Sequence, residues 1–245
     1  MFDHVGIRAT DRAASERFYR TVLDAVGIVQ THSGEWYDEW DVFALGAATD
    51  ERPVTRRLHI AFAVPTREAV HAFWTAGTEA GYRDDGAPGP RPQYGPDYYG
   101  GFLLDPDGNS AEAVTHDQRR RSEIDHLWIR VTDVAAAKRF YETIAPHAGI
   151  RLDADEPDRA QFLVGEDALG GSFSLVSGDE PTEHVHLAFG ASDDATVGAF
   201  HRAATEAGYR DNGGPGERPE YHPGYYGAFV LDPDGNNVEV VNHNR

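Results

Sequence analysis

Two histidines and one glutamate recur in the same order in each half of this 245-residue chain. The set is His4, His59 and Glu112 in the first half and His126, His186 and Glu239 in the second. Each lies in a short apolar stretch typical of a strand, so its side chain points away from its apolar neighbours. A carboxylate in such surroundings is costly unless it is paired, solvated or bound to a metal. Two neutral imidazoles and one carboxylate suit Fe(II), Mn(II), Ni(II), Co(II) or Zn(II), so we predict divalent-metal binding here.

An internal repeat places these residues in register. The segments TEAGYRD (78–84) and DPDGN (105–109) return as 205–211 and 232–236, an offset of 127 residues. Near the start of each half, DHVGIRATD (3–11) aligns with DHLWIRVTD (125–133), an offset of 122 residues. The chain is therefore predicted to be a tandem duplication, with domains 1–115 and 123–245 joined by the polar connector 116–122.

The elements that must position these residues follow from periodicity and from capping signals. In the first half we expect a helix over 13–26 and a second helix from Thr66 to Ala80. Strands are expected over 4–9, 35–46, 57–64, 101–104 and 110–114, and a Gly/Pro-rich loop over 86–97. The second half repeats this order. The sequence thus predicts an α+β fold made of four βαβββ modules.

Composition excludes several classes of function. The chain has no cysteine, which rules out disulfide scaffolds, thiolate metal sites and thiol nucleophiles. Its 22 basic and 41 acidic residues give a formal charge of −19, which argues against a nucleic acid or an anionic membrane as the main partner. No apolar run is long enough for a membrane span, and the charged N-terminus does not resemble a signal peptide. We expect a cytoplasmic protein whose partner is a small-molecule substrate.

The module order, the His, His and Glu set, and the DPDGN turn three residues before each Glu resemble the vicinal oxygen chelate superfamily. This superfamily includes glyoxalase I, type I extradiol dioxygenases, fosfomycin-resistance transferases and bleomycin-binding proteins. The resemblance covers both halves and implies two tandem, glyoxalase-like, half-open barrels around a divalent metal. It also implies that the six repeated residues are the metal ligands and that the protein is a metal-dependent enzyme whose substrate binds through neighbouring oxygens.

Extradiol dioxygenases match the ligand types and their order, which favours Fe(II) or Mn(II) and a dioxygenase-like reaction on a small oxygen-rich or aromatic molecule. Their acid–base groups are incomplete here, because phenylalanine occupies the family's tyrosine position in both halves. His222 lies near the expected histidine position in the second half, where the first half has Gly95. Tyr99 and Tyr226 are predicted to replace the missing tyrosine, so His222, Tyr99 and Tyr226 are the candidate catalytic residues.

Three other activities remain open. Glyoxalase-type lyase or isomerase chemistry needs a further carboxylate, and segments 41–46 and 172–178 offer none in mid-strand, although Glu35, Glu39 and Glu166 lie nearby in sequence. A fosfomycin-type transferase would fit the ligand set. The rival from another class is an antibiotic-binding resistance protein without chemistry, but such binders generally lack the ligand triplet.

The pairing of the six ligands is also open. Each site could take its ligands from one half. Alternatively, in an exchanged pairing, the first histidine of each half joins the other half's second histidine and glutamate. Such a chain would act as a monomeric pseudo-dimer or as a homodimer.

Arg8 and Arg130 lie four residues after the first histidine of each half, on the same face of the strand. They are candidates for binding a carboxylate or phosphate of the substrate, with a surface position at the strand end as the alternative. The remaining histidines are expected at the surface: His32, His71, His116, His147, His201 and His243.

Overall fold

The structure, a computed structural model, describes residues 1–116, 122–165 and 169–245. Most of the predicted connector 116–122 therefore lies outside the described residues, as does Glu166. Each half consists of two modules, and each module has a strand, a helix and three further strands. The first half contains β1 (Phe2–Ala9), α1 (Arg12–Asp24), β2 (His32–Ser33), β3 (Tyr37–Trp40), β4 (Phe43–Ala47), β5 (His59–Ala63), α2 (Arg67–Glu79), β6 (Arg83–Pro90), β7 (Tyr99–Leu104) and β8 (Ser110–Thr115).

The second half repeats the order of the first. It contains β9 (Ile124–Val131), α3 (Val134–Ala148), β10 (Ile150–Glu156), β11 (Arg159–Val164), β12 (Ser172–Ser177), β13 (His186–Gly190), α4 (Asp194–Glu206), β14 (Arg210–Glu217), β15 (Tyr226–Leu231) and β16 (Asn237–Asn242). The predicted α+β fold of four βαβββ modules is confirmed. None of the helices in the described segments is long and apolar enough to cross a membrane.

Short polar side chains start all four helices. Asp11, Thr66, Asp133 and Asp193 occupy the N-cap positions, and each accepts a hydrogen bond from a backbone N–H three residues later. Such caps satisfy N–H groups that have no partner within the helix. Because each capping residue follows directly on a strand or its short connection, it sets the point at which the chain leaves the sheet.

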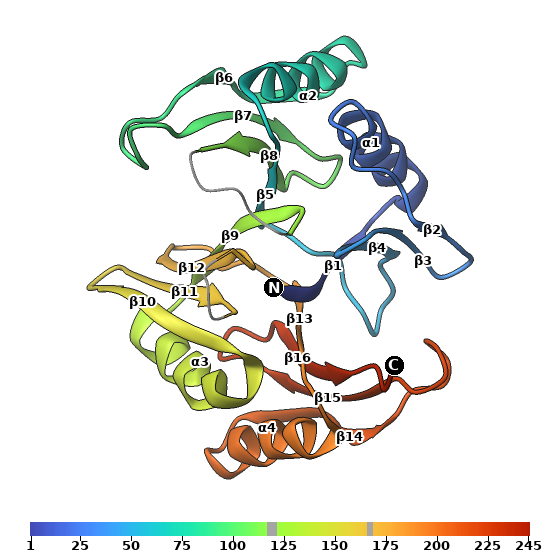
Figure 1. Cartoon of the computed structure of the whole chain (residues 1–245), viewed down its shortest axis with the longest axis vertical. Coiled ribbons are helices and arrows are strands. Elements are labelled where there is room, and N and C mark those ends of the chain that lie inside the picture. Colours follow the sequence, from blue (N-terminus) through green and yellow to red (C-terminus); the bar gives the residue numbers. More distant parts are fainter. Residues whose placement is uncertain (117–121, 166–168) are drawn as a thin grey trace.

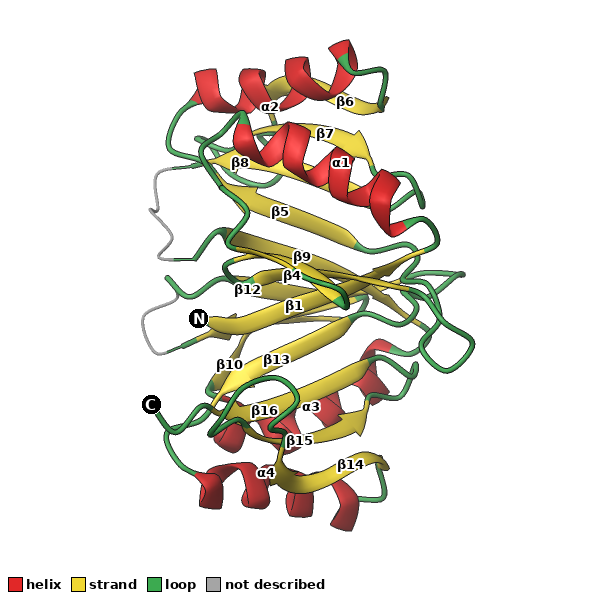
Figure 2. Cartoon of the chain, turned by 90° about the vertical axis from the view of Figure 1, so that its right-hand side faces the viewer, coloured by secondary structure: helices red, strands yellow, loops and turns green. Residues whose placement is uncertain are grey.

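The strands form two eight-stranded sheets that each combine both halves of the chain (Figures 1 and 2). Sheet I has the order β14-β15-β16-β13-β1-β4-β3-β2, and sheet II has the order β10-β11-β12-β9-β5-β8-β7-β6. At the centre of each sheet, a strand of one half pairs antiparallel with a strand of the other, β1 with β13 and β5 with β9. Helices α1 and α4 pack on sheet I, and α2 and α3 pack on sheet II. We call the other face of each sheet its open face.

The helices, unlike the sheets, pair within each half of the sequence, although the buried apolar residues of both halves form one cluster. Helix α1 packs against α2, with Phe18 edge-on to Tyr82 at 4.8 Å between ring centroids. Helix α3 packs against α4, where Phe140 and Tyr209 repeat the contact at 4.8 Å. Each half therefore buries its helices against each other while it lends strands to both sheets.

The first residues of the predicted Gly/Pro-rich loop 86–97, up to Pro90, belong to a strand and not to a loop. Strand β6 runs from Arg83 to Pro90 and pairs with β7, with register shifts around Gly86 and Gly89. The strand tolerates proline because it lies at the edge of sheet II, where one side of the backbone needs no partner. Strand β14 occupies the same place in sheet I.

The DPDGN turn fixes the two ligand-bearing strands of each half relative to each other. The buried Asp105 carboxylate accepts hydrogen bonds from the backbone N–H groups of Asp107 and Asn109, at 2.9 and 2.8 Å. The side-chain carbonyl of Asn109 accepts from the N–H of Leu58, at 3.1 Å, just before β5 begins. Asn236 makes the same contact with the N–H of Val185, at 3.1 Å. The turn thus sets the register between β5 and β8, and between β13 and β16.

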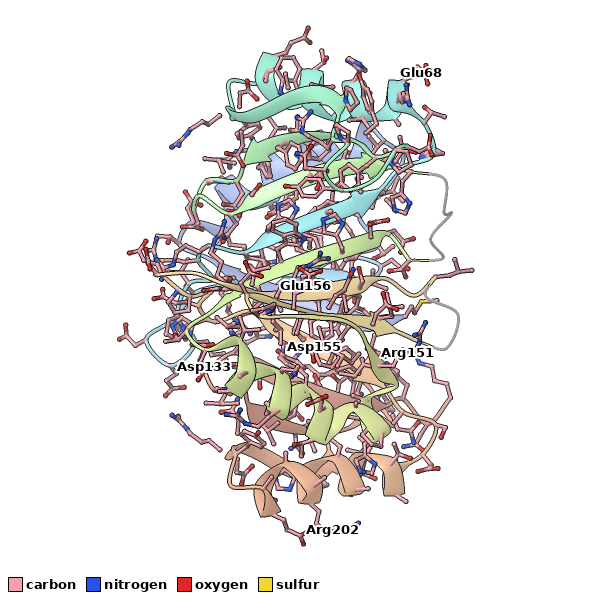
Figure 3. The ribbon with its side chains drawn as sticks, turned by 90° about the vertical axis from the view of Figure 1, so that its left-hand side faces the viewer. Glu68, Asp133, Arg151, Asp155, Glu156 and Arg202 are labelled. Atoms are coloured by element: carbon pink, nitrogen blue, oxygen red, sulfur yellow. The ribbon has the colours of Figure 1, made fainter. Side chains whose placement is uncertain are left out.

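We expect Asn109→Ala and Asn236→Ala each to lower the free energy of unfolding by about 1–3 kcal/mol, because each leaves a buried backbone N–H without its acceptor. Denaturant titration would measure the loss. Arg202→Ala, at the outer surface of α4 (Figure 3), is the control and should change stability by less than about 0.5 kcal/mol. Equal effects of the asparagine and arginine variants would contradict this role of the turn.

Candidate metal centres

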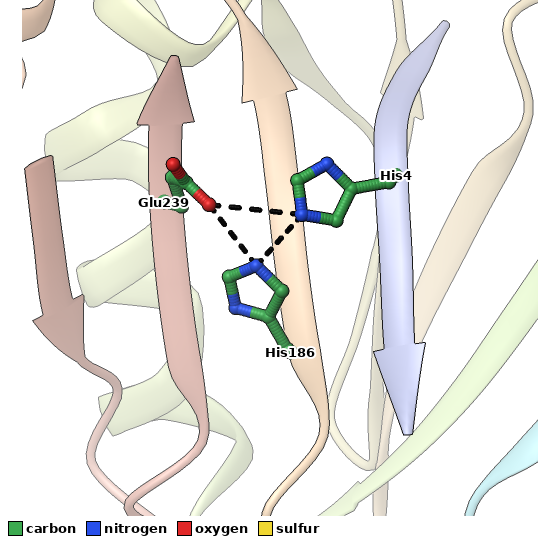
Figure 4. Close-up of side chains that lie close together, drawn as sticks. All are labelled: His4, His186 and Glu239. Carbon is green, nitrogen blue, oxygen red and sulfur yellow. Dashed lines mark hydrogen bonds and ion pairs between the residues drawn. The ribbon is translucent and has the colours of Figure 1, made fainter. Parts of the chain in front are cut away.

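Two clusters of metal-ligating side chains lie on the open faces of the sheets. Site A consists of His4, His186 and Glu239 in sheet I (Figure 4). Site B consists of His59, Glu112 and His126 in sheet II. In each site the ligand atoms lie within 4.8 Å of one another. The structure thus brings the six predicted residues together in the exchanged pairing, in which each half contributes to both sites.

Strand register explains how the three residues of site A converge. His4 on β1 stands opposite Ala188 on β13, which stands opposite Glu239 on β16. These three residues form one row across the open face, and His186 lies two positions before Ala188 on the same face. Because the side chain of Ala188 is small, the side chains of His4 and Glu239 can approach each other above the central strand.

Site B repeats this row. His126 on β9 stands opposite Ala61 on β5, which stands opposite Glu112 on β8. His59 lies two positions before Ala61. Both sites therefore have the same arrangement. An alanine on the central strand lies between a histidine on one neighbouring strand and a glutamate on the other, and the second histidine lies two residues before the alanine.

The ligand atoms are spaced as a metal ion requires. In site A, Nε2 of His186 lies 3.0 Å from Nε2 of His4 and 3.1 Å from Oε2 of Glu239 (Figure 4). In site B, Oε2 of Glu112 lies 3.1 Å from Nε2 of His59 and 3.6 Å from Nε2 of His126. Ligands about 2.1 Å from one ion and at right angles to each other are about 3 Å apart. Both sites fit a 2-His-1-carboxylate centre.

Burial prepares several of these groups for binding a cation. The side chains of Glu112 and Glu239 are 0% and 1% exposed, so an ionised carboxylate there needs a positive partner. Burial lowers the pKa of His59 and of His186, and it outweighs the hydrogen bonds from these rings to the glutamates. Both rings are therefore neutral at pH 7, the form that binds a metal.

An aspartate orients the first histidine of each site. Asp3 lies 2.9 Å from Nδ1 of His4, and Asp125 lies 2.9 Å from Nδ1 of His126. Burial would lower the pKa of His4, but the hydrogen bond to Asp3 and the negative charge of Glu239 raise it above its ordinary value. An aspartate on Nδ1 leaves Nε2 facing the ligand cluster and fixes the ring.

Two tyrosines that the sequence analysis did not select hold the buried glutamates. The hydroxyl of Tyr225 donates to Oε1 of Glu239 at 2.6 Å. The hydroxyl of Tyr98 donates to both carboxylate oxygens of Glu112, at 2.8 and 2.9 Å. Burial and the neighbouring carboxylate raise the pKa of each tyrosine far above its ordinary value, so both phenols stay protonated as donors.

The predicted residues Tyr99 and Tyr226 lie one position further along and point to the opposite face. The hydroxyl of Tyr99 meets Nε2 of His71 at 2.8 Å, and Tyr226 packs against the apolar core. Strand alternation accounts for the difference. Tyr98 and Tyr225 therefore take the place that the prediction gave to their neighbours. The signal that could have found them is their constant distance of 14 residues from the glutamates.

Two histidines expected at the surface belong to the surroundings of the sites. Nε2 of His243 lies 2.8 Å from Asp3, and Nε2 of His116 lies 2.6 Å from Asp125. The two histidines are 127 residues apart, the offset that relates the two glutamates, and this offset could have identified them. His222, predicted as catalytic, lies behind His243, at 2.8 Å between ring nitrogens, and not beside the ligand cluster.

Arg8 and Arg130 stand on the same strands as His4 and His126. The Arg8 guanidinium donates to the carbonyl of Ala47 at 3.3 Å, and that of Arg130 donates to the carbonyl of Arg57 at 2.8 Å. In both of these hydrogen bonds the partner of the guanidinium is a backbone carbonyl and not a carboxylate. Their substrate-binding role stays a prediction.

Comparison with known proteins gives the family. A model described as the Glyoxalase/Bleomycin resistance protein/Dioxygenase superfamily matches residues 1–113 and 123–240. The chain therefore belongs to this superfamily, and the resemblance inferred from the sequence is confirmed. A search of curated proteins found no match.

Solved structures share the fold. Glyoxalase I from Zea mays is similar with a TM-score of 0.70 and 18% identity, over 99% of this chain and 92% of that chain. A putative dioxygenase from Bacillus subtilis subsp. subtilis str. 168 is similar with a TM-score of 0.66 and 13% identity, over 100% of this chain and 85% of that chain. At these identities the likeness concerns the fold alone.

The exchanged pairing predicts which double variants lose both metals. His4→Ala with Glu239→Ala damages one site, so elemental analysis should show the loss of one of two bound ions. His4→Ala with Glu112→Ala damages both sites and should remove both ions. Pairing within each half would reverse the two results and would contradict the arrangement in Figure 4.

Asp3→Asn should weaken metal binding at site A by about 10–100-fold, because the carboxylate that orients the ring of His4 is lost. The variant should also lower the pKa of His4, so the affinity should begin to fall at a lower pH than it does in the parent. Calorimetric titration between about pH 6 and 8, in Glu112→Ala protein with site B disabled, measures both effects. Unchanged affinity and pH dependence would show that Asp3 does not act through His4.

Proposed function

We propose that the chain is a divalent-metal-dependent enzyme that binds a small oxygen-rich or aromatic substrate through two neighbouring oxygens. The observation that carries this proposal is a buried glutamate facing two imidazoles in each site, with donor atoms 3.0–3.7 Å apart in site A. Three protein ligands are fewer than Fe(II) or Mn(II) prefers, so the site would leave positions for water and for substrate oxygens. When bound, the metal supplies Lewis acidity and stabilises negative charge on substrate oxygens.

The residues around site A support this role. Tyr225 holds Oε1 of Glu239 and thereby leaves Oε2 toward the histidines. Asp3 fixes the ring of His4, so the ligand atoms are positioned before an ion binds. Since one chain supplies all three candidate ligands of each site, metal binding should not depend on dimerisation.

A dioxygenase-like reaction is the first candidate, because two histidines and one carboxylate are the donor set of non-haem Fe(II) oxygenases. Fe(II) and Mn(II) are accordingly the favoured metals. A lyase or isomerase of the glyoxalase type is the second candidate. That reaction needs a carboxylate base near the ligands. Glu39 is a candidate, because its negative charge is close enough to His4 to help raise the pKa of that histidine.

The test combines metal content with oxygen consumption. Anaerobically prepared protein should take up about two ions of Fe(II) or Mn(II), as the two sites predict. The Fe(II) form should then consume O2 with a member of a catechol panel. Glu112→Ala with Glu239→Ala should abolish both. Protein that binds none of Fe(II), Mn(II), Co(II), Ni(II) or Zn(II) would overturn the enzyme proposal in favour of a binding protein.

A further inference from the structure

A second row of residues crosses the open face of sheet I beside site A. Glu39 on β3 stands opposite Ala44 on β4, and Ala44 stands opposite Gly6 on β1. Gly6 in turn stands opposite His186 on β13. Residues opposite one another in a sheet share a face, so the Glu39 side chain and the ligands of site A project to the same side.

No bulky side chain of this row separates Glu39 from site A. Ala44 offers one methyl group and Gly6 offers none. A Cβ at Gly6 would lie 3.3 Å from the Cβ and Cδ2 atoms of His186, so even alanine would crowd that ligand. Two strand spacings, about 10 Å, separate the backbones of Glu39 and Gly6. Glu39 thus reaches toward the ligands from a distance suited to contacting a bound molecule rather than the ion.

The Glu39 carboxylate is available for such a contact. Within the described part of the chain, no side chain or backbone N–H donates a hydrogen bond to it and no cation forms an ion pair with it. It is half-buried, and burial raises its pKa above the ordinary value, although His4 and His32 oppose the shift. A carboxylate with a raised pKa is a better proton acceptor than an exposed one.

Site B offers a comparison within the same chain, because three members of this row differ while the histidine at its end is the same. Gln161 replaces Glu39 and accepts a hydrogen bond from Arg159 at 3.0 Å. Trp128 replaces Gly6, with its ring 6.0 Å from that of His59 and 5.4 Å from that of Tyr94. The side chains of His59 and His126 are 12% and 11% exposed, against 22% and 20% for His186 and His4. Site B is therefore more covered and has no carboxylate at this position.

We propose that Glu39 accepts a proton from a two-oxygen substrate bound at site A, and that site A rather than site B carries out the reaction. The O–H bond of a substrate hydroxyl breaks, its electron pair stays on the oxygen, and the proton moves to a carboxylate oxygen of Glu39. The inference rests on the proposed function. It also assigns a carboxylate that the sequence analysis sought in the strand next to β1: β4 has Ala44 there, and β3 supplies Glu39 instead.

The experiment uses 4-nitrocatechol, whose absorbance reports ionisation of its hydroxyls, with Zn(II)-loaded protein that does not activate O2. Glu112→Ala protein confines the probe to site A. Binding spectra are recorded together with the number of protons released to the buffer, from calorimetry in buffers of different ionisation enthalpy. Glu39→Gln is compared in this background, and Glu35→Gln, an exposed residue of the same hairpin, is the matched control.

With Glu39 present, the bound probe should lose its proton to the protein. In Glu39→Gln, either the spectrum should show a more protonated probe or about one additional proton should reach the buffer, with Zn(II) content unchanged. Glu35→Gln should match its parent. Once a substrate is identified, Glu39→Gln should lower its turnover by about 10²–10⁴-fold.

The two proposals fail differently. An identical spectrum and proton count in Glu39→Gln, with Zn(II) and probe still bound, would overturn the role of Glu39 and leave the proposed function standing. Parent protein that binds neither Zn(II) nor the probe would overturn both proposals, whereas Glu112→Ala protein that binds neither while the parent binds both would overturn only the assignment of the reaction to site A. Turnover that survives Glu239→Ala but not Glu112→Ala would overturn the assignment of the reaction to site A.

Discussion

The pairing of β1 with β13, and of β5 with β9, is the constraint on which both metal sites depend. These antiparallel contacts carry the first histidine of each half across to the glutamate and second histidine of the other half. Neither half alone can assemble a site, although each half buries its own helices against each other. Loss of the contact between the halves would therefore remove both sites and would also divide the apolar cluster that the halves share.

That pairing also sets an electrostatic problem, because it buries a carboxylate in each sheet. A tyrosine hydroxyl and two imidazoles are the polar groups that surround Glu239, and all of them come from strands of sheet I or from the segment just before β15. Such a cluster is costly without a cation, since neutral imidazoles offset little of a buried negative charge. A divalent ion resolves the cost, which is the physical reason to expect metal binding to stabilise the fold.

The repeat, the four modules and the six ligand candidates were predictable from the sequence, because strand alternation is a local signal and the offsets of 122 and 127 residues can be read from the sequence itself. The pairing of those ligands was not predictable, since both arrangements use the same strands and the same residue types. The sequence predicted Tyr99 where the structure has Tyr98, because a Tyr-Tyr pair does not reveal which ring faces the glutamate until the register of β7 is known. His116 and His243 carried a usable signal in their shared offset. Their role depends on Asp3 and Asp125, whose side chains meet them only in the folded sheets.

Duplication explains why two sites with the same ligands have different surroundings. The ligands cannot change without leaving a buried charge or imidazole without its partners, so they are held in both copies. The row beside them bears no such penalty, and there Gly6 and Glu39 of one site correspond to Trp128 and Gln161 of the other. A tryptophan beside the ligands adds apolar contact and removes space, which favours stability, whereas a glycine and a free carboxylate favour a bound molecule. Under the two proposals, one chain would thus hold one metal mainly as a structural element and the other where a substrate reaches it.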